Sequence, residues 1–331
     1  MPFFQRFMAR RRALIIGTRS ASQFIIKVLE EKAKNLFDVT GLVSVKLAEE
    51  GATVDGKPIL GEWDDTKALI QQHKIDALII AAKINDELVR FLPACYEMGV
   101  DVIPMTALYE HLTGRVPINY IDETWFFVLL DKNSGMYTFS SKIKRLIDIS
   151  VSTMGLIFFV LILPLIAAAI YIDSPGPIFY KQKRVGQGGR VFSIYKFRSM
   201  KPDVEKGNPV WAENNDPRVT KVGRILRKTY IDELPQFLNI LKGDMSLVGP
   251  RPERPELVEE LALEIPFFKM RQAVKPGMAG WALVKQGYAS SKEEAAIKLE
   301  YDLYYIKHQS LWLDAIIFFK TIFNMLTFRG R

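Results

Sequence analysis

Residues 229–253 read TYIDELPQFLNILKGDMSLVGPRPE, and this stretch organises the second half of the chain. Two adjacent carboxylates, Asp232 and Glu233, open a helical pattern, and Arg251 follows between two prolines. We predict Asp232 as the N-cap of that helix, with Pro235 in the first turn, where a missing N–H costs little. Carboxylates at a helix N-terminus can hold a divalent cation or attack a phosphorus centre, and the helix end itself attracts phosphate. An ordinary capped helix start is the plain alternative, so the surroundings of the motif must decide.

The positive charge of the chain is concentrated around this motif. The 331 residues carry a net charge of +8, and residues 181–254 contain 16 Lys and Arg against 8 Asp and Glu. The rest of the chain is therefore neutral overall. Such a basic segment indicates an anionic partner: a nucleotide, a lipid phosphate, a bilayer surface or a nucleic acid. The single cysteine, Cys95, excludes an internal disulfide and fits a reducing compartment.

The first third of the chain, residues 1–113, predicts an α/β domain with a doubly wound parallel sheet. Buried strand patterns and amphipathic helical patterns alternate along it. The strands are expected at 13–17, 37–45, 75–81 and 100–104, and the helices at 20–34, 63–73 and 85–98. This alternation is typical of parallel sheets covered by helices on both faces.

The first turn of this Rossmann-like domain lacks a dinucleotide fingerprint. It reads GTRSAS from Gly17, without the G-x-G-x-x-G spacing. Ser44 and Lys46 stand where an acidic residue would bind a ribose. We therefore favour a regulatory or assembly module. The alternative is a bound NAD, which would make the chain an NAD-dependent nucleotide-sugar dehydratase or epimerase.

An uncharged stretch of 24 residues, 149–172, predicts a membrane helix. A straight helix of that length reaches about 36 Å, enough to cross a bilayer. Basic residues flank both ends, so the positive-inside rule gives no orientation. Pro164 removes a backbone hydrogen bond and bends the helix. We predict a re-entrant membrane helix at 142–173 that breaks at Pro164 and leaves on the face it entered, after a linker at 114–141. A buried helix of a soluble protein is the alternative.

Residues 174–331 predict a compact, mostly helical α/β domain. A Gly-rich turn at 187–189 is expected to join two strands of a hairpin. The amphipathic pattern at 311–328 fits a helix in the membrane interface or one packed on the core of the protein. Trp281 fits the interface or stacking on a nucleobase.

Several cations are candidates to bind phosphate beside Asp232. A carboxylate that attacks a diphosphate meets anion repulsion, which Mg²⁺ and basic side chains must cancel. A guanidinium matches phosphate geometry, and flanking prolines restrict the backbone of Arg251. Lys196 and Arg198 alternate about Phe197 and are expected to face phosphate from one side of a strand. A solvated or lipid-facing basic surface is the alternative for them.

Four blocks together resemble the bacterial sugar transferase family, the monotopic polyprenyl-phosphate phosphoglycosyl transferases. The blocks lie at 182–189, 195–200, 232–253 and 275–281. The resemblance covers residues 141–331. The upstream sheet domain looks like the cytoplasmic domain of the family's long members, which usually begin with four transmembrane helices. We expect a long-type member without that bundle.

The resemblance implies transfer of a sugar-1-phosphate from a UDP-sugar to a membrane polyprenyl phosphate (undecaprenyl phosphate), giving polyprenyl-diphosphate-sugar and UMP. It makes Asp232 the nucleophile of a covalent phosphosugar intermediate and Glu233 the Mg²⁺ ligand. Arg251 matches a phosphate-binding Arg, and Arg227 a basic residue that pairs with the nucleophile. The other expected phosphate-binding residues are Arg184, Lys196 and Arg198.

The resemblance also implies Mg²⁺ as cofactor and a UDP-sugar, polyprenyl phosphate and membrane lipids as partners, with no nucleic acid. It implies the cytoplasmic face of the bacterial inner membrane, at the first membrane step of capsule, exopolysaccharide or O-antigen assembly. A homodimer is expected from the family's long members. A non-catalytic scaffold that binds anionic lipid is a further alternative. No residue in the sequence identifies the sugar.

Overall fold

The computed structural model describes residues 10–45, 52–83, 85–121, 125, 135–201, 216–287 and 291–327. It divides into two compact units, residues 1–121 and 122–331. Residues 122–124 and 126–134 of the predicted linker at 114–141 lie outside the described residues, as does Lys46, and the predicted domain boundaries stay predictions.

Unit 1 is an α/β layer structure with a six-stranded sheet. Its strands are β1 Arg11–Gly17, β2 Phe37–Ser44, β3 Thr53–Val54, β4 Lys57–Glu62, β5 Ala77–Ala81 and β6 Asp101–Pro104. Its helices are α1 Arg19–Lys32, the 3₁₀ turn η1 Trp63–Asp65, α2 Thr66–His73, α3 Asp86–Glu97 and α4 Met105–Thr113. The strand order is β3-β4-β2-β1-β5-β6, and every pair is parallel except β3 with β4.

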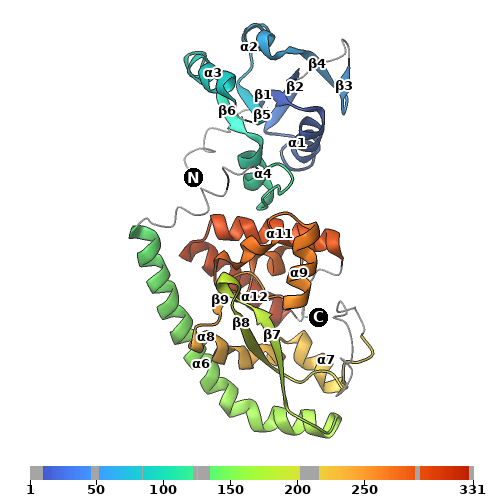
Figure 1. Cartoon of the computed structure of the whole chain (residues 1–331), viewed down its shortest axis with the longest axis vertical. Helices are drawn as coiled ribbons and strands as arrows, with labels where there is room; N and C mark the ends of the chain where they lie inside the picture. The colour runs from blue at the N-terminus through green and yellow to red at the C-terminus, as the bar shows by residue number, and fades with distance from the viewer. Residues whose placement is uncertain are drawn as a thin grey trace. The chain divides into compact units, whose positions relative to one another are not determined.

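Alternate residues of β1 pack into two separate cores. Ala13 and Ile15 face the cluster that contains α1 and α4, whereas Leu14 and Ile16 face the cluster that contains α2, α3 and the buried Cys95. Helices therefore cover both faces of the sheet (Figure 1). The predicted α/β class and parallel sheet are confirmed. The sequence pattern did not predict β4 and α4; β4 is partly exposed along its length and lacks a buried apolar run.

The glycine of the first turn serves strand packing. A Cβ on Gly17 would lie 2.6 Å from the carbonyl oxygen of Ala81, at the end of the neighbouring strand β5. Thr18 caps α1 by accepting a hydrogen bond from the N–H of Ala21. Steric contact between β1 and β5 thus accounts for Gly17 without a bound pyrophosphate.

Unit 2 combines a long helix, a hairpin and a set of short helices. Its strands are β7 Phe179–Val185, β8 Val191–Phe197, β9 Ser246–Val248 and β10 Gly277–Ala279. Its α-helices are α6 Gly135–Asp173, α7 Lys221–Lys228, α8 Phe237–Lys242, α9 Pro255–Glu264, α10 Trp281–Lys285, α11 Lys292–Lys307 and α12 Leu311–Leu326. Its 3₁₀ turns are η2 Gln187–Gly189, η3 Ile231–Gln236 and η4 Phe268–Ala273. The predicted hairpin turn is confirmed, since η2 joins the antiparallel strands β7 and β8.

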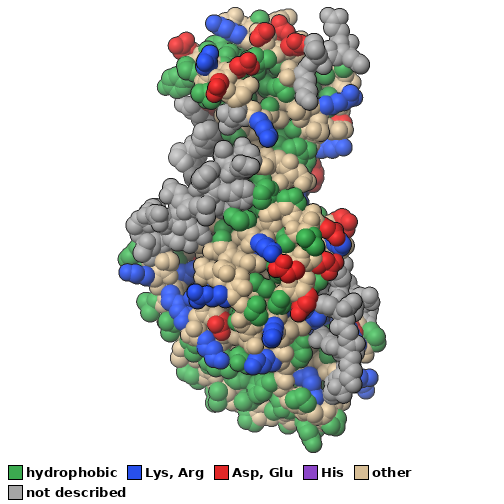
Figure 2. Space-filling model, viewed as in Figure 1, with side chains coloured by type: hydrophobic (Ala, Val, Ile, Leu, Met, Phe, Trp, Pro, Cys, Tyr) green, Lys and Arg blue, Asp and Glu red, His purple; other side chains and the backbone are tan. Residues whose placement is uncertain are grey.

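The helix α6 is long and apolar enough to cross a membrane by length and composition. Within its 35-residue segment Phe139–Asp173, the most apolar window of 18 residues has a mean hydropathy of 2.8, and only 11% of that window is buried. Leu161 and Leu165 are each 75% exposed. Hydrophobic side chains cover the lower margin of the space-filling view, where α6 runs (Figures 1 and 2). This exposed apolar surface fits association with a membrane.

Pro164 lies inside a continuous helix, so the predicted break is wrong in its strict form. Helical structure runs on to Asp173, and Figure 1 shows α6 bent rather than interrupted. Proline removes one backbone hydrogen bond and crowds the preceding turn, which bends a helix without ending it when neighbouring packing supports both halves. That packing is present, because Phe159 before the proline and Ile166 and Ile170 after it join one buried cluster.

Both ends of the apolar stretch of α6 are attached to unit 2. At its start, Asp148 accepts hydrogen bonds from the N–H of Leu247 (3.0 Å) and the hydroxyl of Ser246 (3.1 Å), on β9. Arg145 donates to two carbonyl oxygens at the end of α8. At its end, Asp173 accepts from the N–H of Val222, on α7, at 2.8 Å. The helix is therefore held by the rest of unit 2 at both ends, and Phe159, Ile166 and Ile170 pack against that unit between them.

The parallel pair β9 and β10 approaches unusually closely. A Cβ on Gly277 would lie 2.0 Å from the backbone nitrogen of Gly249. Close contact between two backbones accounts for the glycine at position 277. The approach fixes the point where β9 ends and the segment 250–253 begins.

The last helix, α12, has one buried and one exposed side. Leu313 and Ile317 are buried, whereas Trp312, Phe319 and Phe323 are exposed. Both readings of its amphipathic pattern therefore have structural support. Trp281 is buried and stacks on Tyr304.

Candidate functional site

The two adjacent carboxylates lie in the 3₁₀ turn η3, ahead of α8. The prediction of Asp232 as an N-cap is wrong: the cap position belongs to Tyr230, whose φ is 57°, and no side chain caps the turn. The N–H of Glu233 bonds the carbonyl of Tyr230 at 3.0 Å, so the chain is already turning before Asp232. Asp232 is consequently buried, with 7% of its surface exposed, and is free of a capping role.

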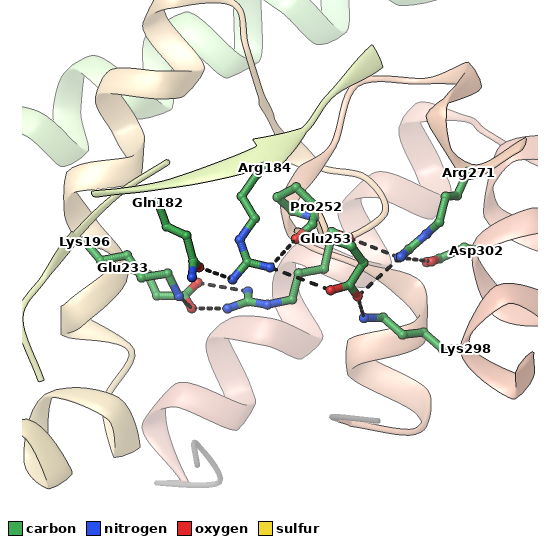
Figure 3. Close-up of polar contacts among 10 residues, drawn as sticks. Gln182, Arg184, Lys196, Glu233, Pro252, Glu253, Arg271, Lys298 and Asp302 are labelled. Carbon is green, nitrogen blue, oxygen red and sulfur yellow. Dashed lines mark hydrogen bonds and ion pairs between the residues drawn. The ribbon is translucent and has the colours of Figure 1, made fainter. Parts of the chain in front are cut away.

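Glu233 forms a buried ion-pair centre. Its carboxylate lies 2.8 Å from Nζ of Lys196 and accepts two hydrogen bonds from the guanidinium of Arg251, one of them at 3.2 Å. Burial alone would raise the pKa of Glu233, but the charges of Arg251 and Lys196 outweigh burial and hold that pKa well below its usual range. Glu233 is therefore ionised throughout the physiological range. Figure 3 shows its contacts with Lys196.

Asp232 has the opposite electrostatic character. Burial raises its pKa from 3.8 to about 6, and the negative charge of Glu233 adds to the shift. Lys196, Arg251 and Arg227 oppose it. Within the described part of the chain, the side chain of Asp232 forms no hydrogen bond. Neighbouring acids with pKa values driven apart are typical of catalytic sites.

The side chain of Asn239 holds this turn against the hairpin. It accepts from the N–H of Tyr195 at 3.1 Å and donates to the carbonyl of Ser193 at 2.7 Å. These bonds tie α8 to β8. Lys196, the residue after Tyr195, is thereby brought to Glu233.

Arg227 reaches the site through its charge. It lies in the last turn of α7 and is partly buried. Its positive charge lowers the pKa of Asp232 and that of Asp216. This long-range effect agrees in direction with the predicted pairing of Arg227 and the nucleophile, a role that stays a prediction.

Two of the residues predicted to bind phosphate, Arg198 and Arg184, donate hydrogen bonds to other groups of the protein. Arg198 was expected to face phosphate beside Lys196; instead its guanidinium donates to the carbonyls of Ser174 and Pro175, just after α6. The strand β8 ends at Phe197, so the alternation that would align the two residues does not continue. Arg184 donates to the carbonyl of Pro252 at 3.0 Å and to the side chain of Gln182 at 2.6 Å.

The carboxylates suit Mg²⁺ only with ligands from a substrate. No group of three or more His, Cys, Asp or Glu side chains that could hold a metal occurs among the described residues. Asp232 and Glu233 together supply two carboxylates. Mg²⁺ in phosphate-transfer sites is commonly held by one or two carboxylates with substrate phosphates and water. The donor set therefore fits an ion that arrives with a diphosphate.

Sequence reasoning missed a second buried cluster beside the first, drawn in Figure 3. Glu253 contacts Arg184, Arg271 and Lys298, and Arg271 also contacts Asp302. One signal was available in the sequence. Asp302 falls on the apolar face of the helical pattern 292–307, where an unpaired charge would be costly.

Comparisons with known proteins match this chain to a family and to named relatives. Residues 139–328 match the family described as bacterial sugar transferase. The UDP-N-acetylgalactosamine-undecaprenyl-phosphate N-acetylgalactosaminephosphotransferase of Aeromonas hydrophila is 44% identical over 257 residues, which cover 77% of this chain and 60% of that protein. A UDP-glucose:undecaprenyl-phosphate glucose-1-phosphate transferase of Klebsiella pneumoniae is 33% identical over 330 residues, covering 97% of this chain and 69% of that protein.

A UDP-glucose:undecaprenyl-phosphate glucose-1-phosphate transferase of Escherichia coli (strain K12) is 42% identical over 184 residues, covering 55% of this chain. The chain spans between 40% and 69% of the length of these three relatives. None of the three is named as a dehydratase or an epimerase, so the NAD-dependent alternative gains no support.

Proposed function

The chain belongs to the bacterial sugar transferase family, and on this premise we propose that it transfers a sugar-1-phosphate from a UDP-sugar to undecaprenyl phosphate, releasing UMP. One observation carries the proposal. Asp232 is a buried, weakly solvated carboxylate set beside Lys196 and Arg251, which already hold the adjacent Glu233. Such an arrangement supplies a nucleophile and the cations that a diphosphate needs.

The proposed reaction has two displacements at one phosphorus. An oxygen of Asp232 bonds to the β-phosphorus of the UDP-sugar, and the bond from that phosphorus to the bridging oxygen breaks, releasing UMP. The product is a mixed anhydride between Asp232 and the sugar phosphate. An oxygen of the lipid phosphate then attacks the same phosphorus and releases the carboxylate. Every attacking and leaving group is an anionic oxygen, so neither step requires a proton transfer from the protein.

The residues around Asp232 act on charge and orientation. Arg251, restricted by two prolines, presents a planar guanidinium that matches phosphate oxygens, and Lys196 adds a second cation. Arg227 favours the ionised form of Asp232. Glu233, with Asp232, would hold Mg²⁺, which when bound neutralises charge on the diphosphate.

We propose that α6 is a re-entrant membrane helix. Its polar start is bonded to β9 and α8, and its end to α7, all within unit 2. A helix that crossed the bilayer would carry its far end away from that unit. This attachment supports entry and exit on one face, which we assign to the cytoplasmic side of the inner membrane because UDP-sugars are cytoplasmic.

The test is a UMP-release screen with the full chain in lipid nanodiscs, undecaprenyl phosphate and Mg²⁺. UDP-glucose, UDP-galactose and their N-acetylated forms are the donors, since the relatives differ in their sugar. We expect UMP and a lipid-linked sugar with at least one donor. Absence of UMP with all four would contradict the proposal and favour the lipid-binding scaffold.

The pH dependence of the reaction should follow Asp232. Its raised pKa means that the nucleophilic carboxylate forms only above about pH 6. We expect kcat/KM to rise about tenfold per pH unit below pH 6 and to level off above it. The measurement is initial UMP release from about pH 5 to about pH 8.5, with thermal unfolding recorded at each pH as a control. A level profile down to pH 5 would contradict the assignment of Asp232.

A further inference from the structure

The backbone around Arg251 is fixed at four consecutive peptide groups. The carbonyl oxygens of residues 250–253 all accept hydrogen bonds from groups distant in sequence. In chain order the donors are the N–H of Gly277 (2.9 Å), the guanidinium of Arg271 (3.0 Å), the guanidinium of Arg184 (3.0 Å) and the N–H of Val185 (2.9 Å). Side chains therefore complete a hydrogen-bond pattern that two prolines, lacking N–H groups, cannot form in a regular sheet.

The two guanidiniums in this pattern share one counter-ion, Glu253. Its carboxylate lies 3.3 Å from the guanidinium of Arg271 and 3.7 Å from that of Arg184. It also forms an ion pair with Lys298. Arg271 is also paired with Asp302, whose side chain is 1% exposed. Figure 3 shows these groups converging from three elements: β7, η4 and α11.

Stability alone is a weak explanation for this cluster. A buried ion pair contributes little net free energy, because desolvation offsets its attraction, and apolar side chains of similar volume often do as well. Moreover, the Nε atoms of Arg184 and Arg271 are buried without a hydrogen-bond partner in the described structure. The terminal nitrogens are directed to the backbone carbonyls and to Glu253. The two guanidiniums thus hold the carbonyls of Arg251 and Pro252 in place while their own Nε atoms stay without a partner among the described residues.

We propose that Arg271 is a positioning residue for Arg251, holding its backbone so that the guanidinium faces the diphosphate beside Glu233. This inference rests on the proposed function, since it assigns Arg251 to phosphate binding. In this role Arg271 acts on the backbone of Arg251 and not on the substrate. Its role depends on the fork of the guanidinium, which reaches the carbonyl of Arg251, Glu253 and Asp302 together.

Arg271→Lys separates geometry from charge. Lysine keeps the positive charge that Glu253 and Asp302 need, but one ammonium cannot reproduce the planar fork. A displacement of about 1 Å in a positioning group can cost on the order of 10²-fold in activity. We expect this variant to weaken binding of UDP by about tenfold, because Arg251 loses part of its orientation.

The test is a double-mutant cycle read by UDP binding. Isothermal titration of UDP with Mg²⁺ is carried out on the full chain in nanodiscs, for the wild type, Arg271→Lys, Arg251→Ala and the double variant. If Arg271 acts through Arg251, the tenfold loss appears only while Arg251 is present. Equal losses in both backgrounds would overturn the inference.

Controls distinguish positioning from folding and from the proposed function. Lys269→Ala removes an exposed ion pair from the same 3₁₀ turn and should leave UDP binding unchanged. If Arg271→Lys fails to fold, Asp302→Asn takes its place in the cycle, with the same expected non-additivity. A wild type that neither binds UDP nor releases UMP refutes the proposed function; one that does both, with an additive cycle, refutes only the role of Arg271.

Discussion

Asp232→Asn should reduce UMP release by at least about 10³-fold, because the amide oxygen is a poor nucleophile towards phosphorus. The fold should survive, since Asn has the same shape and Asp232 forms no hydrogen bond within the described residues. The measurement is initial UMP release under saturating UDP-sugar, together with a search by mass spectrometry for a sugar-phosphate adduct. In the wild type without lipid acceptor, the adduct should lie on the peptide that contains residue 232.

The same variant should be more stable than the wild type. The folded state raises the pKa of Asp232 to about 6, so above that pH the ionised carboxylate disfavours folding, and this effect disappears below pH 3.8. Asn removes the penalty, and we expect the free energy of unfolding at about pH 7.5 to rise by about 1–3 kcal/mol. Glu259→Gln, at an exposed carboxylate, is the matched control and should change neither quantity. An Asp232→Asn enzyme that kept its activity would contradict the assignment of Asp232 as the nucleophile.

Arg251→Ala should lower kcat/KM by about 10²–10³-fold. The substitution removes a preorganised guanidinium from the diphosphate and leaves Glu233 with Lys196 as its remaining ion-pair partner. The effect should appear both in KM and in kcat, because charge builds up on the phosphate as the bridging bond breaks. Steady-state UMP release against UDP-sugar concentration measures both constants.

Arg251→Lys is the informative companion. It restores the charge without the two-pronged geometry, so we expect recovery of about one order of magnitude and no more. A lysine variant as active as the wild type would show that charge alone is needed. The acidic limb of the pH profile should also shift to higher pH in Arg251→Ala, because Arg251 lowers the pKa of Asp232 and its removal raises that pKa.

The sequence predicted the parts of the fold that local patterns determine. Strands such as β1 and β5 are short apolar runs, and the hairpin of β7 and β8 turns at a Gly-rich segment, so periodicity and turn chemistry suffice. The strand β4 was not predicted, because its residues are partly exposed and include Pro58. Its pairing with β2 depends on the neighbouring strand and not on its own pattern.

The candidate site was predictable in composition but not in arrangement. Adjacent acids among cations indicated phosphate chemistry, and the structure brings Lys196, Glu233 and Arg251 together. The same information placed Asp232 at a helix cap, because an acid before a helix usually serves as one. The backbone of Tyr230 is left-handed, which depends on tertiary structure, and the side chain of Asp232 lies in the interior instead. Partners such as Arg271 and Asp302 lie too far along the chain for any local pattern to connect.

The two attachments of α6 have a mechanical consequence. Because α6 is held by unit 2 at both ends, its reach into a bilayer is set by its own length and bend. If α6 is the re-entrant helix proposed above, it cannot tilt to match a thicker or thinner bilayer as an independent span does, so the lipids would have to adapt around it. The carboxylate of Asp232 would then lie at a constant height above the lipid surface. The phosphate of the lipid would meet it with the same geometry in every membrane that holds α6.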